Sequence, residues 1–213
     1  ARQKDVEVFL ASRQARVIAP LLTASPSPTG QPTTSDEAIQ LPFGASLPVD
    51  KWQGNLAQMR MPDGQSKWVQ SNGLLSIEQC PRLDSAGITF TLDLIKRFIG
   101  VPYLWGGCSP FGYDCSGLAR TFYSFMGLDL PRDADQQFRV GKDVEGKPQP
   151  GDLLFFGRVN PDQPPSQRFN AITHVAISLG DDEIIHANGA TWCTAYNSLN
   201  PAHPLYRADL AEI

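Results

Sequence analysis

The run YDCSGLARTFYSFMG, residues 113–127, decides the fold that this sequence predicts. Its apolar residues recur at the spacing of one helix face: Leu118, Phe122 and Phe125. Gly127 follows the last of them and is a suitable helix end, so we predict a helix whose first turn contains Cys115. Unpaired backbone N–H groups and the helix dipole favour an anion there, and we therefore expect a stabilised Cys115 thiolate.

The segments around this helix indicate a domain in which helices precede strands. An earlier stretch also has helical periodicity and can end at Gly100. Its apolar residues are Leu92, Ile95, Phe98 and Ile99. The apolar runs after Pro150 have strand length: 153–156, 173–179 and 183–187. Helices first and antiparallel strands later predict an α+β domain, with helices packed on an antiparallel sheet, over residues 81–213.

The first part of the chain has a different pattern, with short strand-like pieces separated by turn residues. The pieces are 15–18, 38–41, 56–61 and 68–70. Gly54 and the Pro62-Asp63-Gly64 sequence are among the turn signals between them. Short strands with regular turns predict a small all-β barrel or sandwich, which we place at residues 1–80.

Two of the three histidines, His174 and His186, flank Gly180-Asp181-Asp182 in a predicted β-hairpin. If these three residues form the loop, His186 lies opposite Ala176 and both imidazoles emerge on one face of the hairpin. A two-residue loop would place the imidazoles on opposite faces. The sequence therefore predicts a three-residue loop if the two histidines work together.

A cysteine, a later histidine and a third polar group that orients the histidine form the papain-like arrangement. We predict Cys115 as the nucleophile, His174 as its base and His186 as the orienting group. Gly117 leaves room beside the thiol for a substrate backbone. Taken singly, each of these residues also has an ordinary structural explanation, because an inert buried cysteine and a surface histidine are common.

Composition excludes several classes of function. Apolar residues make up 41% and charged residues 19% of the 213 residues, which is typical of a globular protein. A net charge of -4 without a basic stripe argues against nucleic acid as a partner. No apolar run approaches the roughly 20 residues that span a bilayer, and the charged start of the chain lacks a signal-peptide pattern. We expect a monomer without a membrane span.

The four cysteines show neither a dense disulfide framework nor paired Cys-x-x-Cys zinc spacing. Their spacing leaves open whether Cys80, Cys108 and Cys193 form disulfides. An alternative to the nucleophile is a Cys2His2 metal site, formed by Cys108, Cys115, His174 and His186. We expect no metal and no cofactor, because the zinc alternative leaves the residues around Cys115 unexplained.

Six ordered motifs over about a hundred residues resemble the NlpC family of bacterial cell-wall peptidases. They are Pro102-Tyr103-Leu104-Trp105-Gly106-Gly107, Asp114-Cys115-Ser116-Gly117, Leu130-Pro131-Arg132-Asp133, Pro150-Gly151-Asp152-Leu153, His174-Val175 and Ile185-His186-Ala187. The first domain is similar to the bacterial Src-homology-3-like (SH3-like) barrels that often precede such domains. Its cues are Phe43-Gly44, Trp52, Asp63-Gly64 and Trp68-Val69.

The resemblance implies hydrolysis of the bond between γ-D-glutamate and diaminopimelate or lysine in peptidoglycan stem peptides or murein fragments. It implies Asp114 and Ser116 as substrate contacts and Tyr103 as a neighbour of the reacting carbonyl. Glu37 and Trp68 of the barrel are our candidates for meeting the free amino end of the peptide. Ala134 departs from the hydroxyl residue that many relatives carry, so one hydrogen bond to the glutamyl carboxylate is expected to be missing.

Some alternatives stay open beside this resemblance. A peptidoglycan-binding module with an inactive catalytic domain would carry the same motifs. The protein could work in the periplasm, outside the cell, or in the cytoplasm on recycled murein. We expect Trp52, Trp105 and Trp192 to pack in cores, with lining of a cleft as the alternative for Trp192. A local ion pair is an alternative explanation of Arg132-Asp133.

Overall fold

The computed structural model describes residues 7–9, 11–12, 14–28, 38–159 and 169–211. The chain divides into two compact units, Ala1–Cys80 (unit 1) and Pro81–Ile213 (unit 2). All four cysteines carry free thiols. Within the described ranges, no helix has both the length and the apolar character needed to cross a membrane.

Unit 1 contains eight short strands in its described residues. They are β1 (Ala15–Val17), β2 (Leu21–Ala24), β3 (Ile39–Pro42), β4 (Ser46–Leu47), β5 (Val49–Gln53), β6 (Leu56–Arg60), β7 (Ser66–Gln70) and β8 (Leu74–Ser76). Two 3-10 turns, η1 (Ser71–Gly73) and η2 (Ile77–Gln79), flank β8. The strands form three antiparallel sheets, ordered β4-β1-β8, β2-β3 and β5-β6-β7. The likeness to SH3-like barrels stays a prediction.

The core of unit 1 comes from alternating residues such as Ala57 and Met59 of β6, which are fully buried. Gly54 and Gly64 make the two turns of the β5-β6-β7 meander, with φ of 59° and 86°. Trp52 is 51% exposed, so the expectation that it packs in the core was wrong. The register of β5 shifts between Val49 and Lys51, and the rest of this strand lies exposed.

Unit 2 has helices followed by a four-stranded antiparallel sheet, which confirms the predicted α+β class. The elements before the sheet are α2 (Ser85–Ile95), η3 (Lys96–Phe98), β9 (Cys108–Ser109), β10 (Gly112–Tyr113), α3 (Cys115–Phe125) and α4 (Ala134–Val140). The sheet has the order β11 (Leu153–Val159), β12 (Phe169–Gly180), β13 (Glu183–Asn188) and β14 (Cys193–Ser198), and α5 (Ala208–Ala211) follows it.

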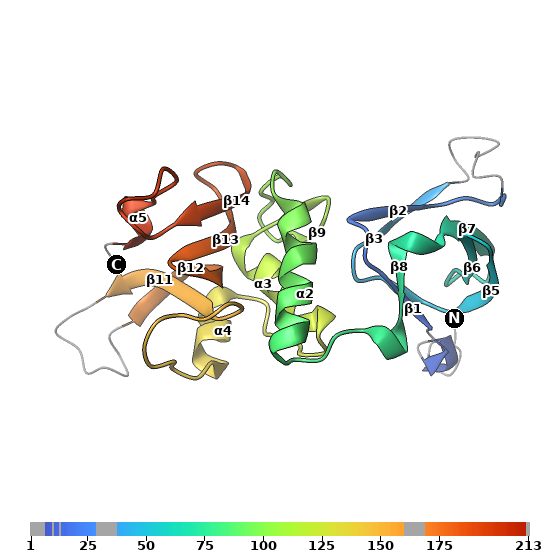
Figure 1. The fold of residues 1–213 in the computed structure, drawn as a ribbon, viewed down its shortest axis with the longest axis horizontal. Helices are drawn as coiled ribbons and strands as arrows, with labels where there is room; N and C mark the ends of the chain where they lie inside the picture. Colours follow the sequence, from blue (N-terminus) through green and yellow to red (C-terminus); the bar gives the residue numbers. More distant parts are fainter. Residues whose placement is uncertain (1–6, 10, 13, 29–37, 160–168, 212–213) are drawn as a thin grey trace. The chain divides into compact units, whose positions relative to one another are not determined.

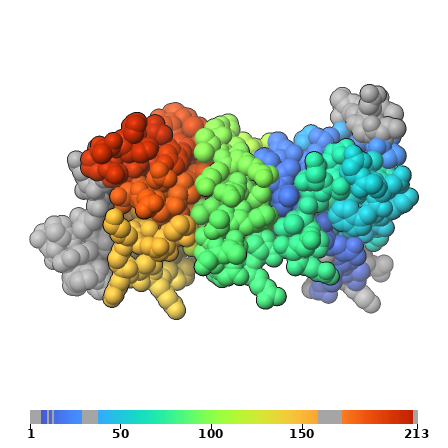
Figure 2. Space-filling view, in the orientation of Figure 1, coloured from blue at the N-terminus to red at the C-terminus, as the bar shows by residue number. Residues whose placement is uncertain are grey.

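Helix α3 contacts β12 and β13, and α4 contacts β12 (Figure 1). Because α3 buries Leu118, Phe122 and Phe125, its apolar face is the one that the sequence predicts. The yellow residues around α4 adjoin the orange residues of the sheet on the surface as well (Figure 2). This packing places α3, which begins at Cys115, against the two strands that carry the histidines.

The β12–β13 hairpin has a two-residue loop, so the predicted three-residue loop was wrong. Gly180 pairs with Glu183, and Asp181 and Asp182 between them adopt φ of 52° and 63°. Positive φ at both loop residues gives a turn whose twist matches that of the strands. The register then shifts between Ser178 and Gly180, so that Ser178 pairs with Ile184. Beyond this bulge the strands pair in the register that the prediction required, with Ile177 opposite Ile185.

Candidate active site

Cys115 is the first residue of α3, and Asp114 is its N-cap. The Asp114 carboxylate accepts a hydrogen bond of 2.7 Å from the Gly117 backbone N–H, which satisfies one unpaired donor of the first turn. A Cβ at Gly117 would lie 2.1 Å from the carbonyl oxygen of Gly107. The room that glycine leaves is therefore taken by the chain itself, and this close approach fixes α3 against the loop before it.

His174 on β12 and His186 on β13 form a direct pair. Nε2 of His174 lies 2.6 Å from Nδ1 of His186, and the ring centroids are 4.9 Å apart. Burial, the neighbouring His186 and Arg207 lower the pKa of His174 to about 3. Burial also lowers the pKa of His186, to about 4. Both rings are therefore neutral at neutral pH.

The Cys115 thiol is neutral as well. Burial raises its pKa above the usual value, and the charge of Asp114 adds to this. The backbone N–H groups of Val175, Ser116 and Cys115 act in the opposite direction without reversing the shift. The stabilised thiolate expected from the helix position is thus not the resting form, because desolvation outweighs the helix end. Because the backbone of Val175 acts on the Cys115 pKa, the thiol lies close to the residue that follows His174.

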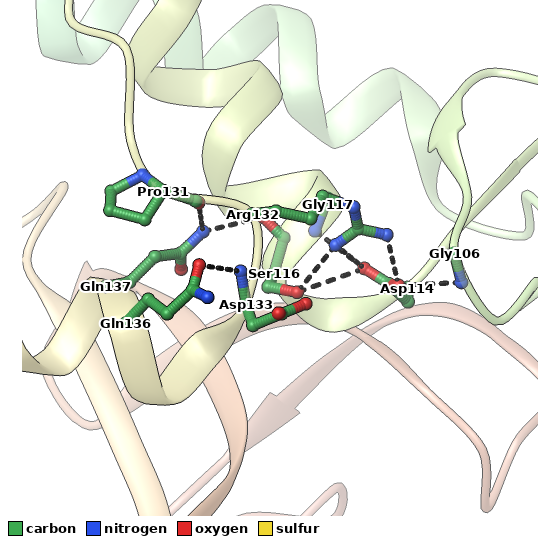
Figure 3. A network of polar contacts seen from close by, with 9 residues as sticks. All are labelled: Gly106, Asp114, Ser116, Gly117, Pro131, Arg132, Asp133, Gln136 and Gln137. Atoms are coloured by element: carbon green, nitrogen blue, oxygen red, sulfur yellow. Dashed lines mark hydrogen bonds and ion pairs between the residues drawn. The ribbon is translucent and has the colours of Figure 1, made fainter.

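A network of polar contacts surrounds Asp114 (Figure 3). Arg132 Nη2 lies 2.5 Å from Asp114 Oδ2, and Arg132 Nη1 donates to Oδ1 at 3.1 Å and to Ser116 Oγ at 2.9 Å. The Gly106 N–H also donates to Asp114 Oδ2, at 2.9 Å. Burial would raise the pKa of Asp114, but the hydrogen bonds from Arg132, Gly117 and Gly106 lower it. Arg132 is therefore not limited to a local interaction with Asp133, because its ion pair is with Asp114.

Gln137 of α4 is a residue that the sequence reasoning missed. Its side chain is 1% exposed, and its Nε2 donates to the carbonyl oxygens of Ser116 (3.0 Å) and Pro131 (2.9 Å) (Figure 3). Ser116 follows the candidate nucleophile, and Pro131 precedes Arg132. One amide group therefore ties α4 to both the first turn of α3 and the Arg132 segment.

A pocket of about 550 Å³ opens at the Cys115 end of α3. Four of the predicted site residues line it: Tyr103, Asp114, Cys115 and Ser116. The other lining residues are Trp105, Gly106, Arg132, Asp133, Ala134, Asp135, Ile172 and Thr173. Burial, followed by the proximity of Cys115 and Asp114, raises the pKa of Tyr103, so its hydroxyl is protonated and can donate a hydrogen bond at neutral pH.

Two tryptophans near this pocket are exposed, so the expectation of core packing was wrong. Trp105 is 86% and Trp192 is 72% exposed, although Trp192 stacks edge-on against Tyr103 with centroids 6.3 Å apart. Both lie in loops, outside the sheet and helices that form the core. Trp192 has a φ of 54°, and its carbonyl accepts a hydrogen bond of 2.8 Å from the Tyr103 N–H.

The two barrel candidates belong to unit 1. Trp68 lies half-buried on β7, with the Lys51 ammonium 6.0 Å from its ring centroid. Glu37 lies outside the described residues. Their contacts with a substrate stay predictions. Across the described part of the chain, no three side chains of His, Cys, Asp or Glu converge as metal ligands would.

Two asparagines around His186 were also missed. Asn197 Oδ1 lies 3.0 Å and Asn188 Nδ2 lies 3.2 Å from His186 Nε2. Asn188 stands two residues after His186, so the alternation of a strand alone would have placed it on the same face. Finding Asn197 required β14, a strand that the sequence reasoning did not predict, and its pairing with β13.

Comparisons with known proteins agree with the motifs. The NlpC/P60 family profile matches residues 100–205. The chain is 29% identical over 157 residues to the gamma-D-glutamyl-L-lysine dipeptidyl-peptidase of Bacillus cereus (strain ATCC 10987 / NRS 248), a match that covers 73% of this chain and 45% of that protein. It is 40% identical over 99 residues to the protein of the same name from Bacillus subtilis (strain 168), covering 45% of this chain and 31% of that protein. The chain thus spans less than half the length of these two relatives.

Among solved structures, the crystal structure of an NlpC/P60 family protein from Bacillus cereus ATCC 10987 is similar to this chain. Its TM-score is 0.77 at 25% sequence identity, and the match covers 95% of this chain and 63% of that one.

Proposed function

Because the chain belongs to the NlpC/P60 family through residues 100–205, we propose that it is a cysteine endopeptidase acting on peptidoglycan stem peptides. The bond that it cleaves joins γ-D-glutamate to a diamino acid, either diaminopimelate or lysine. The observation that carries this proposal is the 2.6 Å contact between His174 and His186, on two strands that α3 packs against. The names of the two relatives support the bond, since both refer to gamma-D-glutamyl-L-lysine.

In the proposed mechanism Cys115 is the nucleophile and His174 is the base. Nε2 of His174 faces His186, so Nδ1 is the nitrogen left for the thiol proton. Because both groups are neutral at rest, the proton moves to His174 as the sulfur attacks the carbonyl carbon. His174 then gives this proton to the leaving amine, and water hydrolyses the thioester with His174 again as the base.

The developing oxyanion needs hydrogen-bond donors at the mouth of the pocket. The Cys115 backbone N–H, at the start of α3, is one candidate, and the neutral Tyr103 hydroxyl is the other. Removal of one such donor typically lowers the rate by about 10² to 10³. His186 accepts the hydrogen bond of His174 Nε2–H and so holds the ring while His174 becomes charged.

The substrate contacts are proposed from the same pocket. Ser116 and Arg132 present a hydroxyl and a guanidinium that suit the free carboxylate of γ-D-glutamate. Asp114 is 6% exposed and already accepts bonds from Arg132, Gly106 and Gly117, so a substrate amine would share its carboxylate with Arg132. Glu37 and Trp68 remain candidates for the amino end of the peptide.

The test is incubation of the protein with L-Ala-γ-D-Glu-diaminopimelate, its lysine counterpart and their amine-blocked forms. We expect release of the diamino acid from the free peptides. Cys115→Ala should abolish turnover, while Cys108→Ala is the matched control, since Cys108 is an exposed thiol close in sequence.

Cleavage of neither free peptide would overturn the proposed function. Equal cleavage of free and blocked peptides would overturn the roles given to Asp114, Glu37 and Trp68. Peptide binding by the wild-type protein without turnover would favour the inactive binding module.

A further inference from the structure

Two side-chain amides favour opposite protonation states of one nitrogen of His186. Asn197 presents its oxygen to His186 Nε2 at 3.0 Å, and Asn188 presents its nitrogen to the same atom at 3.2 Å. The three side chains are closed off from solvent, with exposures of 1% for His186, 4% for Asn188 and 8% for Asn197. The amide oxygen of Asn197 can only accept a hydrogen bond, so it favours a hydrogen on Nε2. The amide N–H of Asn188 can only donate, so it favours an unprotonated Nε2 with a free lone pair.

Each amide is held in its orientation by a backbone group. Asn197 Nδ2 donates to the Leu205 carbonyl oxygen at 3.2 Å. Asn188 Oδ1 accepts from the Thr191 backbone N–H at 2.9 Å and from its hydroxyl at 3.1 Å. Rotating either amide by half a turn would place two donors or two acceptors face to face. The conflict at His186 Nε2 therefore cannot be relieved by exchanging oxygen and nitrogen.

The tautomer of His186 decides which nitrogen of His174 can take a proton. With the hydrogen on Nε2, His186 donates to Asn197, and its Nδ1 accepts from His174 Nε2–H. Nδ1 of neutral His174 is then unprotonated and can serve as a base. With the hydrogen on Nδ1, His186 donates to His174 Nε2, so the hydrogen of neutral His174 sits on Nδ1. That form has no lone pair for the Cys115 proton.

We propose that Asn197 is a positioning residue that selects the Nε2–H tautomer of His186, and through it the basic tautomer of His174, while Asn188 favours the opposite tautomer. This inference rests on the proposed function, because it assigns the base of that reaction. The shorter contact belongs to Asn197. The same tautomer suits the charged intermediate, because protonated His174 keeps Nε2–H pointed at an accepting Nδ1.

The charged groups near His174 and His186 do not by themselves favour one tautomer of His186. Arg207 and Asp209 influence both imidazoles, with opposite signs. They also bind each other through two hydrogen bonds of 2.6 and 2.7 Å. Burial keeps His186 neutral at neutral pH, so the ring carries one hydrogen and must choose between the two nitrogens.

The test combines ¹⁵N NMR of labelled histidines, which reports the protonation of each ring nitrogen, with peptide kinetics. In the wild-type protein we expect hydrogen on Nε2 of His186 and none on Nδ1 of His174. Asn197→Leu should move hydrogen to His186 Nδ1 and lower kcat by roughly 10- to 100-fold with little change in KM. A wholly wrong tautomer in a Ser-His-Asp triad costs about 10⁴.

Two further variants separate tautomer selection from a merely structural role. Asn188→Leu should keep the wild-type tautomer and change kcat by less than about threefold, because the shorter contact stays. Adding Asn188→Leu to Asn197→Leu should raise kcat above that of Asn197→Leu alone, because the opposing donor is gone. Two structural lesions would instead add up. Asn197→Asp, which keeps the acceptor, should retain the wild-type tautomer even if Asn197→Leu fails to fold.

Hydrogen on His186 Nδ1 in the wild-type protein, or an unchanged tautomer in Asn197→Leu, would overturn the inference. A further loss of kcat in the double variant would also overturn it. The spectra need no substrate. The expected spectra without peptide cleavage would sink the proposed function alone, while cleavage with the wrong tautomer would sink this inference alone.

Discussion

On the helix side of the site Asp114 keeps its charge, whereas on the sheet side His174 and His186 lose theirs. Asp114 is buried at the start of α3 and receives hydrogen bonds from Arg132, Gly106 and Gly117, which together lower its pKa. The histidines lie on a buried face of the β12–β13 hairpin with amide and imidazole neighbours, so that burial dominates and lowers their pKa. Desolvation opposes charge on both sides, but only Asp114 receives direct hydrogen bonds from a cation and from backbone N–H groups that offset it.

The same difference between the two sides explains why the Cys115 thiol, which lies between them, is protonated at rest. The helix side places a carboxylate next to the thiol, and the two histidines of the sheet side are neutral. The thiol and the His174 imidazole are then both neutral, so that in the proposed mechanism charge separates only as the substrate is attacked. Four experiments would break or sharpen this contrast.

The largest effect is expected from His174→Gln. An amide can hydrogen-bond to His186 but cannot take a proton, so kcat/KM should fall by about 10⁴-fold or more, as for loss of a base that works with a nucleophile. Circular dichroism should show an unchanged fold. Peptide kinetics with His203→Gln as the control, a histidine that stacks on Tyr196 away from the pair, checks the assignment. Comparable losses in both variants would contradict it.

Arg132→Met should destabilise unit 2 by about 3 kcal/mol, because it leaves a buried carboxylate without its ionic partner. The matched control is Arg139→Met on α4, whose pair with Asp135 is mostly exposed. Its removal should change the free energy of unfolding by less than about 1 kcal/mol. Urea unfolding of both variants is the measurement.

The double variant Arg132→Met with Asp114→Asn should recover part of the loss, since the unpaired charge is gone. If it is no more stable than Arg132→Met alone, charge burial is not the reason for the destabilisation.

Lowering the pH should decrease the free energy of unfolding of unit 2, because His174 on the sheet side of the site is neutral when folded. The pKa of His174 is about 3 in the folded chain and near 6.5 when unfolded, so the unfolded state binds more protons between these values. This contribution to stability is complete above pH 6.5 and is lost as the pH falls toward 3, by up to about 1.4 kcal/mol for each pH unit in between. Unfolding free energies from pH 7 to pH 4 measure it. His174→Gln should show a shallower loss, and an identical slope would refute the cause.

The smallest effect is expected from Gln137→Leu. It removes two hydrogen bonds to backbone carbonyls and should lower the free energy of unfolding by about 1 to 2 kcal/mol. Because Gln137 joins the Cys115 turn to the Arg132 segment, kcat/KM should fall severalfold. Arg139→Met, a change of an exposed side chain on the same helix, is the control and should leave kcat/KM unchanged. A larger loss in the control would contradict the bracing role.

How far the sequence predicted this protein depends on the distance between interacting residues. The α+β class of unit 2 and the helix that begins at Cys115 follow from apolar spacing and local caps. The prediction of a hairpin was right and its loop length was wrong, because Gly-Asp-Asp fits both a three-residue loop and a two-residue loop with a bulge. Only the positive φ of both Asp181 and Asp182 distinguishes them, yet both solutions bring the histidines to one face.

The sequence by itself determined where the candidate nucleophile and the candidate histidines lie, because helix capping and strand alternation act between near neighbours in the chain. The tertiary structure alone decided their electrostatics. Arg132 reaches Asp114 across 18 residues, Gln137 reaches Ser116 across 21, and Asn197 reaches His186 across 11. Burial, which reverses the expected shift of the Cys115 pKa, depends on how α3 packs against the sheet. Desolvation and long-range pairing are properties of the packed chain, so no local pattern of residues contains them.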